Sequence, residues 1–598
     1  MTLHYSYAAP WGAQLTENGV RFRLWAPGEK HIGVLLEDED QRLLPMTAGD
    51  GGWFECTTAE ARAGSRYRYV LGDGGRVPDP ASRLQPADAH GASEVIDPRA
   101  YAWTSTDWRG RPWAEAVIYE VHLGAFTPAG NYDGARGRIE HLAAFGVTAL
   151  ELMPLSDFAG SRNWGYDGVL PFAPAAAYGR PDDLKHLIDA AHARGLMIFL
   201  DVVYNHFGPS GNYLARYAPD FFTVCHHTPW GEAIDFTRRE VREFFIHNAL
   251  YWLEEYRFDG LRFDAVDQIR DPSPVHILTE IAETVRERIT DRHVHLVLEN
   301  DDNAARYLER DAAGKPRRCT AQWNDDFHHV AHVLATGEGD GYYADYAGQP
   351  AAALARALAE GFVYQGEHSA YRNRPRGERS AHLPPLAFVN FLQNHDQIGN
   401  RAYGERLTAL APPERLRALY ALLFLSPSVP LLFMGEEWAA GTPFLYFCDY
   451  TGELASAVRS GRRAEFARFA GFRDPRSRAD IPDPNVDETF VRSRLVWPET
   501  REPRHGEWLA FLSNLIACRR RELVPRLAGL ASGRRKMLDT AAFAVAWPLA
   551  GGGQWQVAAN LGAMPLAAPA TAGRLVYAQP VSAEATLPAW SVRVVLDE

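Results

Sequence analysis

Short apolar runs alternate with amphipathic segments between about residues 110 and 440 of this 598-residue chain. Apolar runs without alternation are typical of strands buried on both faces of a parallel sheet. Between them, apolar residues at helical spacing predict helices, for example Leu184, Leu187, Ile188 and Ala191 ahead of Gly195. The runs that fit strands are 117–123, 149–154, 197–203, 260–264, 295–299, 321–325, 388–392 and 429–434.

Eight strands alternating with helices predict an α/β fold of the (β/α)8 TIM-barrel type, which we place at residues 109–534. The stretch 207–236, rich in Pro, Gly and aromatic residues, interrupts the rhythm and predicts an inserted subdomain. Thr237 and Glu240 fit a capping box that opens the next helix. A helix from about 507 to 524 contains Arg519, Arg520 and Arg521, which we interpret as a solvated face.

The two ends of the chain have strand patterns. Residues 1–108 contain alternating segments at 19–27 and 67–71, which predict an N-terminal β-sandwich. Segments 543–547 and 555–559 flank a turn of three glycines at 551–553. This pattern predicts a hairpin in a small C-terminal β domain at 535–598.

Composition narrows the possible partners. The net charge of −13 argues against binding to nucleic acid or to an anionic membrane, because both require a basic face. The five cysteines are scattered without a CxxC pair, so neither a zinc site nor a disulfide framework is indicated. The start of the chain lacks the pattern of a signal peptide, and no long apolar run could span a membrane. We therefore expect a reduced, cytoplasmic protein without membrane contact.

Charged and polar residues follow directly after several predicted strands. The third strand leads into Asp201 and His206, the fourth ends at Asp264, the fifth at Glu299, and the seventh precedes Asp396. Active sites of such barrels lie at the C-terminal ends of the strands. Burying charge there is costly unless the charge is paired or used. These residues are therefore the candidate catalytic groups.

Hydrolysis of a glycosidic bond requires acidic side chains grouped in this way. In retaining enzymes, a nucleophilic carboxylate and a carboxylic acid lie about 5–5.5 Å apart. Asp264 and Glu299 end adjacent strands, whose spacing of about 4.8 Å suits that separation. We interpret Asp264 as the nucleophile and Glu299 as the general acid/base, because neighbouring carboxylates raise its proton affinity. Arg262, two residues before Asp264 on the same side of the strand, is expected to hold Asp264 ionised.

Histidine and aromatic residues near these strand ends could contact sugar. His206 and His395 can bind hydroxyl groups, and Tyr166 offers a stacking face. Trp164 fits either a sugar platform, which we favour, or a wall of its loop. Trp230 fits either the substrate end or the core of the subdomain, and neither is preferred.

Other polar residues have open or structural interpretations. His328 and His329 form a neighbouring pair without a third metal ligand, so we expect substrate contact or packing. Glu436 and Glu437 fit either a sugar contact or an ion pair. His186 and His192 are expected at the surface of a helix.

The motifs 201–206, 260–264, Glu299 and 394–396 resemble, in the same order, the four signature regions of the α-amylase superfamily. The resemblance implies Asp264 as nucleophile, Glu299 as acid/base and Asp396 as the aspartate that stabilises the transition state. It also implies that a group of side chains surrounds the first sugar site: Arg262, His206, His395 and Tyr166.

A closer resemblance covers nearly the whole chain. Segments 163–169, 323–329 and 432–438, together with the N-terminal sandwich, are similar to the maltooligosyltrehalose trehalohydrolase family. Enzymes of that family cut the α-1,4 bond next to a terminal trehalose. The resemblance therefore implies that the substrates are maltooligosyltrehalose and water, and that the protein acts after a maltooligosyltrehalose synthase. Within these segments, Asp167 and Asp326 join Trp164, His328 and His329 as candidate substrate-binding residues. A glycogen branching enzyme, a general α-amylase and an inactive glucan-binding protein remain alternatives.

The chain departs from many amylases after the nucleophile. Where those enzymes have a Lys-His pair, this chain has Asp267 and Gln268. The missing histidine and the absence of a DxDxDG loop argue against a calcium requirement, so we predict neither a metal nor a cofactor. The lysine at the position of Asp267 contacts sugar in those relatives, so its absence argues against amylase-like recognition of ordinary glucan beyond the cleavage point. Asp267 itself is a candidate substrate-binding residue.

Overall fold

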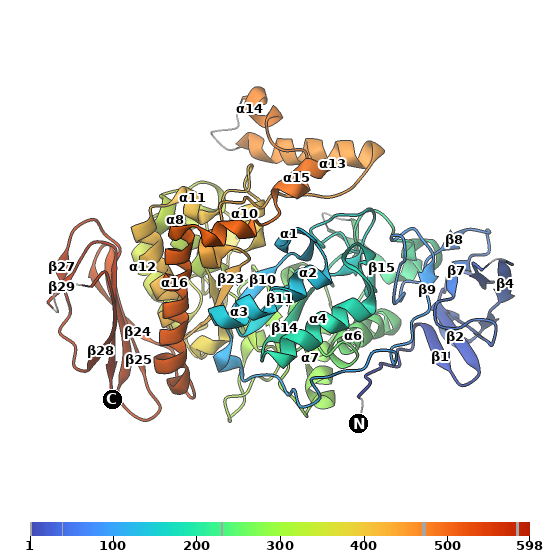
Figure 1. Cartoon of the computed structure of the whole chain (residues 1–598), viewed down its shortest axis with the longest axis horizontal. Coiled ribbons are helices and arrows are strands. Elements are labelled where there is room, and N and C mark those ends of the chain that lie inside the picture. Colours follow the sequence, from blue (N-terminus) through green and yellow to red (C-terminus); the bar gives the residue numbers. More distant parts are fainter. Residues whose placement is uncertain (1–2, 39, 229–230, 469–473, 582–584) are drawn as a thin grey trace.

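The computed structural model describes residues 3–38, 40–228, 231–468, 474–581 and 585–598. Eight parallel strands close into a barrel at the centre of the molecule (Figure 1). Each strand coincides with an apolar run of the sequence, so the (β/α)8 prediction is confirmed. The barrel strands are β10 (Ile118–Val121), β11 (Ala149–Leu152), β14 (Met197–Val202), β17 (Gly260–Phe263), β18 (His295–Leu298), β19 (Ala321–Trp323), β22 (Phe388–Phe391) and β23 (Val429–Phe433).

Helices surround the barrel and cover its outer face (Figure 1), and the strand residues are buried. Gly146, in the left-handed region at φ 107°, ends the helix that covers β10 and β11. The connection from β18 to β19, residues 299–320, contains only the short 3-10 turn η6 (Ala305–Leu308). The covering helices are α3 (Ile139–Phe145), α4 (Pro181–Ala193), α6 (Arg239–Glu254), α7 (Ile277–Arg288), α8 (Asp325–Thr336), α9 (Pro350–Glu360), α12 (Pro413–Leu425) and α16 (Pro503–Cys518).

The N-terminal part is a sandwich of two antiparallel sheets. Phe22 and Tyr67 pack edge to face between the sheets, with ring centroids 4.7 Å apart. Trp11 packs against Phe244 of α6 and so joins this part to the barrel. Its strands are β1 (Gly12–Thr16), β2 (Gly19–Trp25), β3 (Gly33–Leu36), β4 (Arg42–Pro45), β5 (Thr47–Ala48), β6 (Trp53–Thr58), β7 (Arg66–Val70), β8 (Arg76–Val77) and β9 (Ser93–Glu94).

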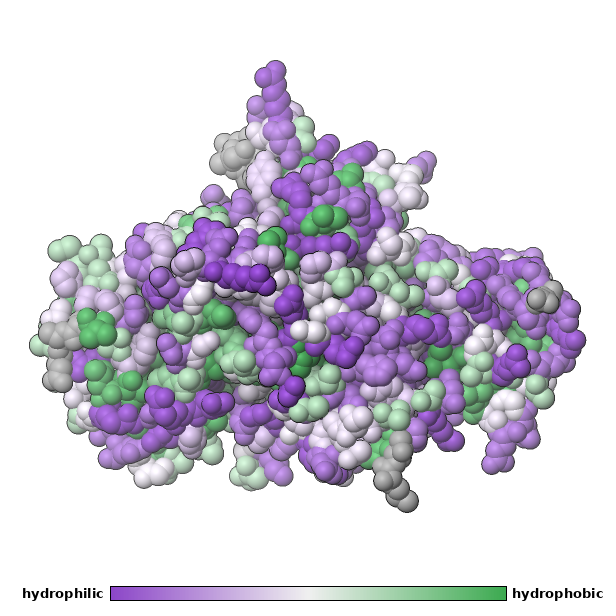
Figure 2. Space-filling view, in the orientation of Figure 1, coloured by the Kyte–Doolittle hydropathy of each residue, from purple (hydrophilic) through white to green (hydrophobic). Residues whose placement is uncertain are grey.

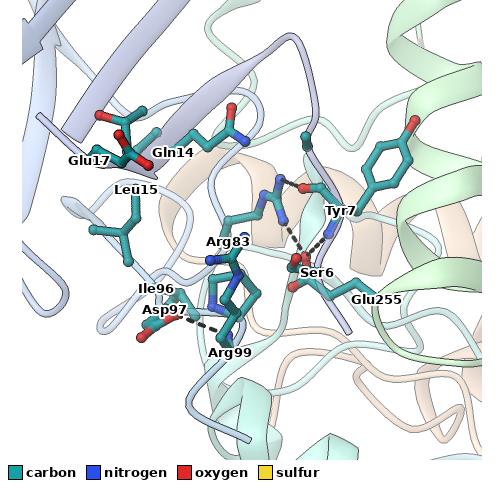
Figure 3. A pocket seen from close by; sticks show the side chains of 14 residues that line it. Ser6, Tyr7, Gln14, Leu15, Glu17, Arg83, Ile96, Asp97, Arg99 and Glu255 are labelled. Atoms are coloured by element: carbon teal, nitrogen blue, oxygen red, sulfur yellow. Dashed lines mark hydrogen bonds and ion pairs between the residues drawn. The ribbon is translucent and has the colours of Figure 1, made fainter. Parts of the chain in front are cut away.

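A cavity of about 500 Å³ lies between the sandwich and the barrel (Figure 3). The Arg83 guanidinium pairs there with the Glu255 carboxylate at 3.1 Å, and the backbone N–H of Tyr7 donates to the same carboxylate. Glu255 directly follows α6, which leads back to the start of β17. The cavity therefore lies toward the N-terminal ends of the barrel strands, away from the predicted catalytic groups.

The C-terminal part is an antiparallel five-stranded sheet with a separate two-stranded ribbon. It lies at the opposite end of the molecule from the sandwich (Figure 1). The predicted hairpin is confirmed, because Trp547 pairs with Trp555 across its two strands. The strands are β24 (Arg534–Asp539), β25 (Ala542–Pro548), β26 (Gln554–Asn560), β27 (Leu566–Ala567), β28 (Arg574–Gln579), β29 (Thr586–Leu587) and β30 (Ser591–Asp597).

Two excursions leave the barrel near the C-terminal ends of its strands. The stretch 207–236 contains α5 (Leu214–Tyr217) and a hairpin of β15 (Phe222–Thr228) and β16 (Gly231–Ile234). Trp230 lies outside the described residues. The second excursion projects beyond the barrel (Figure 1) and was not separated from it by the sequence pattern. Its helices are α13 (Gly452–Glu465), α14 (Pro475–Ala479) and α15 (Asp487–Arg492).

Three local predictions were wrong. Thr237 does not cap α6, because its backbone N–H and hydroxyl both donate to the Asp235 carboxylate. Arg519 is buried and donates to the carbonyl oxygens of Phe424, Ser426 and Ser428, although Arg520 and Arg521 are exposed as expected. His192 is buried against Asp259 at 2.9 Å, whereas His186 is exposed.

Hydrophilic residues cover most of the face seen in Figure 2, with apolar residues scattered among them. Among the described residues, no helix combines the length and the apolar character that crossing a membrane requires.

Candidate active site

Arg262 brings the acidic residues of three barrel strands together. Its Nη1 donates to Oδ2 of Asp201 at 2.7 Å and to Oδ1 of Asp264 at 2.9 Å. Its Nη2 lies 2.9 Å from Oε2 of Glu299, a close contact without the angle of a hydrogen bond. The ends of β14, β17 and β18 therefore meet at a single guanidinium.

The burial of Arg262 requires compensation. Its side chain is fully buried, and its Cζ lies 4.1 Å from the centre of the Trp323 ring. A buried cation is tolerated when carboxylates and an aromatic face surround it. Arg262 is consequently held in one position, in contact with the acidic side chains.

Asp264 is held on both carboxylate oxygens. Oδ1 accepts from Arg262, and Oδ2 accepts from Nδ2 of Asn205 at 2.8 Å. The next residue, Ala265, has φ 39° in the left-handed region, and its N–H donates to Oε2 of Glu299 at 2.7 Å. The strained turn that follows Asp264 therefore contacts the carboxyl group of Glu299.

The surroundings shift the pKa values of Glu299 and Asp396 in opposite directions. Burial raises the pKa of Glu299 well above its usual range, and the charges of Asp264 and Asp396 raise it further against the opposing effect of Arg262. Burial also raises the pKa of Asp396, but His395 and other partners outweigh it, and the net pKa is lowered. One carboxyl is therefore kept protonated beside another that stays ionised.

Tyr166, His206 and His395 lie around these acids, as the sequence predicted. The Tyr166 hydroxyl donates to Asp201 at 2.6 Å, and its half-buried ring stacks on His395 with centroids 5.0 Å apart. His206 Nε2 lies 2.9 Å from the backbone carbonyl of Tyr166, and burial lowers the His206 pKa. The imidazole of His206 is therefore neutral near pH 7.

Asp167 and Asp267 are half-buried at the same mouth and stay candidates for sugar contact. Asp167 accepts from Nδ2 of Asn163 at 2.8 Å. Asp267 borders a cavity of about 340 Å³ together with Asn300 and Arg306. Because Asn300 directly follows Glu299, this cavity adjoins the loop that carries the proposed acid.

Several other candidates are buried away from the cleft. Trp164 is 5% exposed, stacks on Phe444, and donates from Nε1 to the Leu445 carbonyl, so it forms a wall rather than an open platform. His328 is fully buried between the Leu392 carbonyl and the Tyr343 hydroxyl. His329 is also buried, and burial lowers its pKa. Packing, one of the two predicted alternatives, describes both histidines.

Asp326 and the two adjacent glutamates are also structural. Asp326 has no exposed surface, and it pairs with Arg376 at 2.5 Å. The substrate contact predicted for Asp326 is therefore wrong. Glu436 and Glu437 are buried and accept from the hydroxyls of Tyr420 and Tyr119, so neither faces a sugar.

We predict that Asp326→Asn lowers stability rather than catalytic rate. Removing this carboxylate leaves the buried Arg376 under-compensated, at a cost of about 3 kcal/mol. Because the folded-state pKa of Asp326 is lowered, its contribution is present above the unfolded pKa of about 3.9 and is lost as pH falls through the folded value. Calorimetric unfolding of both proteins between pH 3 and 7 checks this. Equal transition temperatures at neutral pH would contradict it.

Two acidic residues at the site, and one on the barrel strand beside it, were not predicted from the sequence. Glu120 on β10 bonds to His395, and Glu151 is its register partner on β11. Burial, followed by the charge of Asp301, raises the pKa of Asp325 to about 7, and Asp396 adds to this. Glu120 and Glu151 each interrupt an otherwise apolar strand run, which was an available signal.

Among the described residues, no group of three or more His, Cys, Asp or Glu side chains is arranged to hold a metal ion.

Known protein families resemble this chain in each of its three parts. Three family models match: "Carbohydrate-binding module 48 (Isoamylase N-terminal domain)" at residues 10–87, "Alpha amylase, catalytic domain" at 95–220, and "Domain of unknown function (DUF3459)" at 531–594. A structure from Salmonella typhimurium described as an α-amylase is 47% identical, with a TM-score of 0.95 over 99% of this chain and 100% of that one. A pullulanase from Anoxybacillus, 18% identical with a TM-score of 0.72, shares the fold.

The barrel, its acidic mouth and these matches define a glycoside hydrolase of the α-amylase superfamily. Malto-oligosyltrehalose trehalohydrolase of Deinococcus radiodurans is 43% identical over 85% of this chain and 82% of its own length. The enzyme of that name from Mycobacterium tuberculosis H37Rv is 39% identical over 93% of this chain and 95% of its own. The chain belongs to the malto-oligosyltrehalose trehalohydrolase family.

Proposed function

We propose that this protein hydrolyses the α-1,4-glucosidic bond next to the terminal trehalose of maltooligosyltrehalose, releasing trehalose with retention at the cleaved carbon. The names of its relatives and the arrangement of Asp264 and Glu299 around Arg262 support this proposal. The observation that carries it is the contrast between these two groups: Asp264 accepts hydrogen bonds from Arg262 and Asn205, whereas burial and neighbouring carboxylates raise the pKa of Glu299 well above its usual range.

The reaction follows from that contrast. The Glu299 carboxylic acid gives its proton to the glycosidic oxygen while an oxygen of Asp264 attacks the anomeric carbon. The C–O bond breaks, its electron pair stays with the departing trehalose oxygen, and a glycosyl ester forms on Asp264. Glu299, now a carboxylate, takes a proton from water, whose oxygen attacks the anomeric carbon and frees Asp264.

Asp396 has a separate role in this scheme. Its lowered pKa keeps it ionised beside the reacting ring, where it can accept hydrogen bonds from sugar hydroxyls. Such bonds accelerate the reaction only if they strengthen in the transition state. Tyr166, stacked on His395, supplies the apolar face for the same ring.

The departing trehalose lies on the side of the general acid, because the acid must reach the leaving oxygen. The cavity bordered by Asp267, Asn300 and Arg306 adjoins that side. Its polar lining suits the hydroxyl groups of a disaccharide. The substrate would be made by a maltooligosyltrehalose synthase, which converts the reducing end of a maltooligosaccharide to trehalose.

Product analysis tests this function. With maltopentaosyltrehalose, we expect trehalose and maltopentaose as the main products, and with maltohexaose at equal concentration, slower cleavage by about tenfold or more. Chromatography of both digests over time measures the ratio. Equal cleavage of the two would indicate a general α-amylase, new α-1,6 branches a branching enzyme, and binding without cleavage an inactive glucan-binding protein.

A further inference from the structure

Glu120 places a carboxylate inside the barrel, where it is 1% exposed. Both of its oxygens contact a single residue: Oε1 lies 2.5 Å from Nδ1 of His395, and Oε2 accepts the backbone N–H of His395 at 3.1 Å. An isolated carboxylate is costly to bury, so the contact with His395 compensates for the burial of Glu120. The pair links the first strand of the barrel to the loop after the seventh.

His395 lies between two carboxylates. Its Nδ1 faces Glu120, and its Nε2 lies 3.4 Å from Oδ1 of Asp396. A neutral imidazole has one N–H and one lone pair, so it would turn a lone pair toward one of the two carboxylates. An imidazolium donates from both nitrogens and satisfies both. Although burial opposes the charge, Asp396 and Glu120 raise the pKa of His395 well above its usual range.

Aromatic contacts fix the orientation of the ring. Tyr166 stacks on His395 with an interplanar angle of 20°, and Trp164 meets it edge-on at 5.6 Å. Other titratable or charged groups face the His395–Asp396 pair from neighbouring elements: Glu151 on β11, Arg262 on β17, Glu299 after β18, His122 after β10, Asp325 and His328 on α8, and Tyr342 in the segment after α8.

We propose that Glu120 is a positioning residue that holds His395 as an imidazolium in one orientation, with its Nε2–H directed at Asp396 and the adjoining sugar. The inference rests on the proposed function for the importance of Asp396, but the charge state of His395 does not depend on which glycan is cut. Glu120 touches no substrate in this scheme. It acts through His395, which keeps Asp396 ionised and supplies a charged donor at the mouth.

Titration of the unmodified protein tests the charge directly. Protein with histidine labelled with carbon-13 at the ring Cε1 is followed by NMR, and the His395 signal is assigned by its absence in His395→Gln. We expect this signal to remain at the imidazolium position well above the usual histidine pKa of about 6.5. Titration of His395 near pH 6.5 in the resting protein would overturn the proposal without any variant of Glu120.

Glu120→Gln and Glu151→Gln form a matched pair of variants. Glutamine at 120 removes the charge and leaves only one acceptor for the two His395 donors. Glu151 lies opposite Glu120 in the register, neither of its oxygens has a hydrogen-bond partner, and burial raises its pKa far above the usual range. It is therefore already neutral, and glutamine at 151 changes no charge.

In Glu120→Gln we expect His395 to lose its proton at a lower pH than in wild type, and kcat at alkaline pH to fall about tenfold or more relative to wild type. KM should change less than kcat, and the loss should shrink as pH falls. Glu151→Gln should keep the wild-type pH profile. A cationic His395 in Glu120→Gln, or equal changes in both variants, would overturn the proposal. Failure of trehalose release in wild type would instead contradict the proposed function and leave the titration intact.

Discussion

Asp264→Asn lowers kcat on maltooligosyltrehalose by about four orders of magnitude or more and leaves the protein folded. The amide oxygen is too weak a nucleophile to form the glycosyl ester, so the first chemical step fails. Asparagine has nearly the same shape, and its side-chain oxygen can still accept from Arg262, whose second partner Asp201 remains. Single-turnover kinetics of both proteins, with circular dichroism to check folding, measure the effect.

Asp311→Asn is the matched control for this prediction. Asp311 lies in an exposed turn after β18 and is replaced by the same isosteric amide. Its kcat should equal that of wild type. Activity of Asp264→Asn within tenfold of this control would remove Asp264 as the nucleophile, because no other carboxylate shares its two-sided hydrogen bonding to Arg262 and Asn205 among the described residues.

The barrel could be predicted from the sequence because its information is local. An apolar run such as 197–203 is readable without knowledge of its neighbours, and parallel strands all end on the same side. This rule alone brought Asp264, Glu299 and Asp396 into one candidate site. Arg262 lies two residues before Asp264, and in the structure it contacts Asp264 and Glu299 together with Asp201.

Pairings between distant segments were not readable in this way. Asp326 lies in a motif with the family pattern, but Arg376, fifty residues further along, determines that it is buried. The sequence pattern indicated that Arg519 is solvated, but in the structure it donates to carbonyl groups at the end of α12. His192 is buried because Asp259 lies against it. In each case the partner is fixed by packing, which residue type and spacing do not encode.

Glu120 is another residue whose role could not be predicted from the sequence. A glutamate within a buried strand was visible in the sequence, but its meaning depends on a loop 275 residues away. Catalytic groups of such barrels are expected at the ends of strands, and Glu120 lies within a strand. A charged residue that interrupts an apolar barrel strand is itself a signal for a buried partner.

Glu299→Gln should separate the two chemical steps. On maltooligosyltrehalose we expect kcat to fall about 10²- to 10⁴-fold, because the leaving sugar oxygen no longer receives a proton. With α-maltosyl fluoride the leaving group needs no acid, so the first step should stay within about tenfold of wild type. The second step lacks its base, and a glycosyl ester on Asp264 should accumulate to a level visible by mass spectrometry of the intact protein.

The pH dependence gives an independent check on the same residue. The raised pKa of Glu299 means that wild-type activity on maltooligosyltrehalose is lost as pH rises through that value, since the acid form is required. In Glu299→Gln with the fluoride, release of fluoride in the first turnover should show no such alkaline decline. An unchanged alkaline decline, or an equal loss on both substrates without an accumulating ester, would assign the acid to another group. Asp325, whose pKa is raised to about 7 beside Asp396, would then be the residue to replace next.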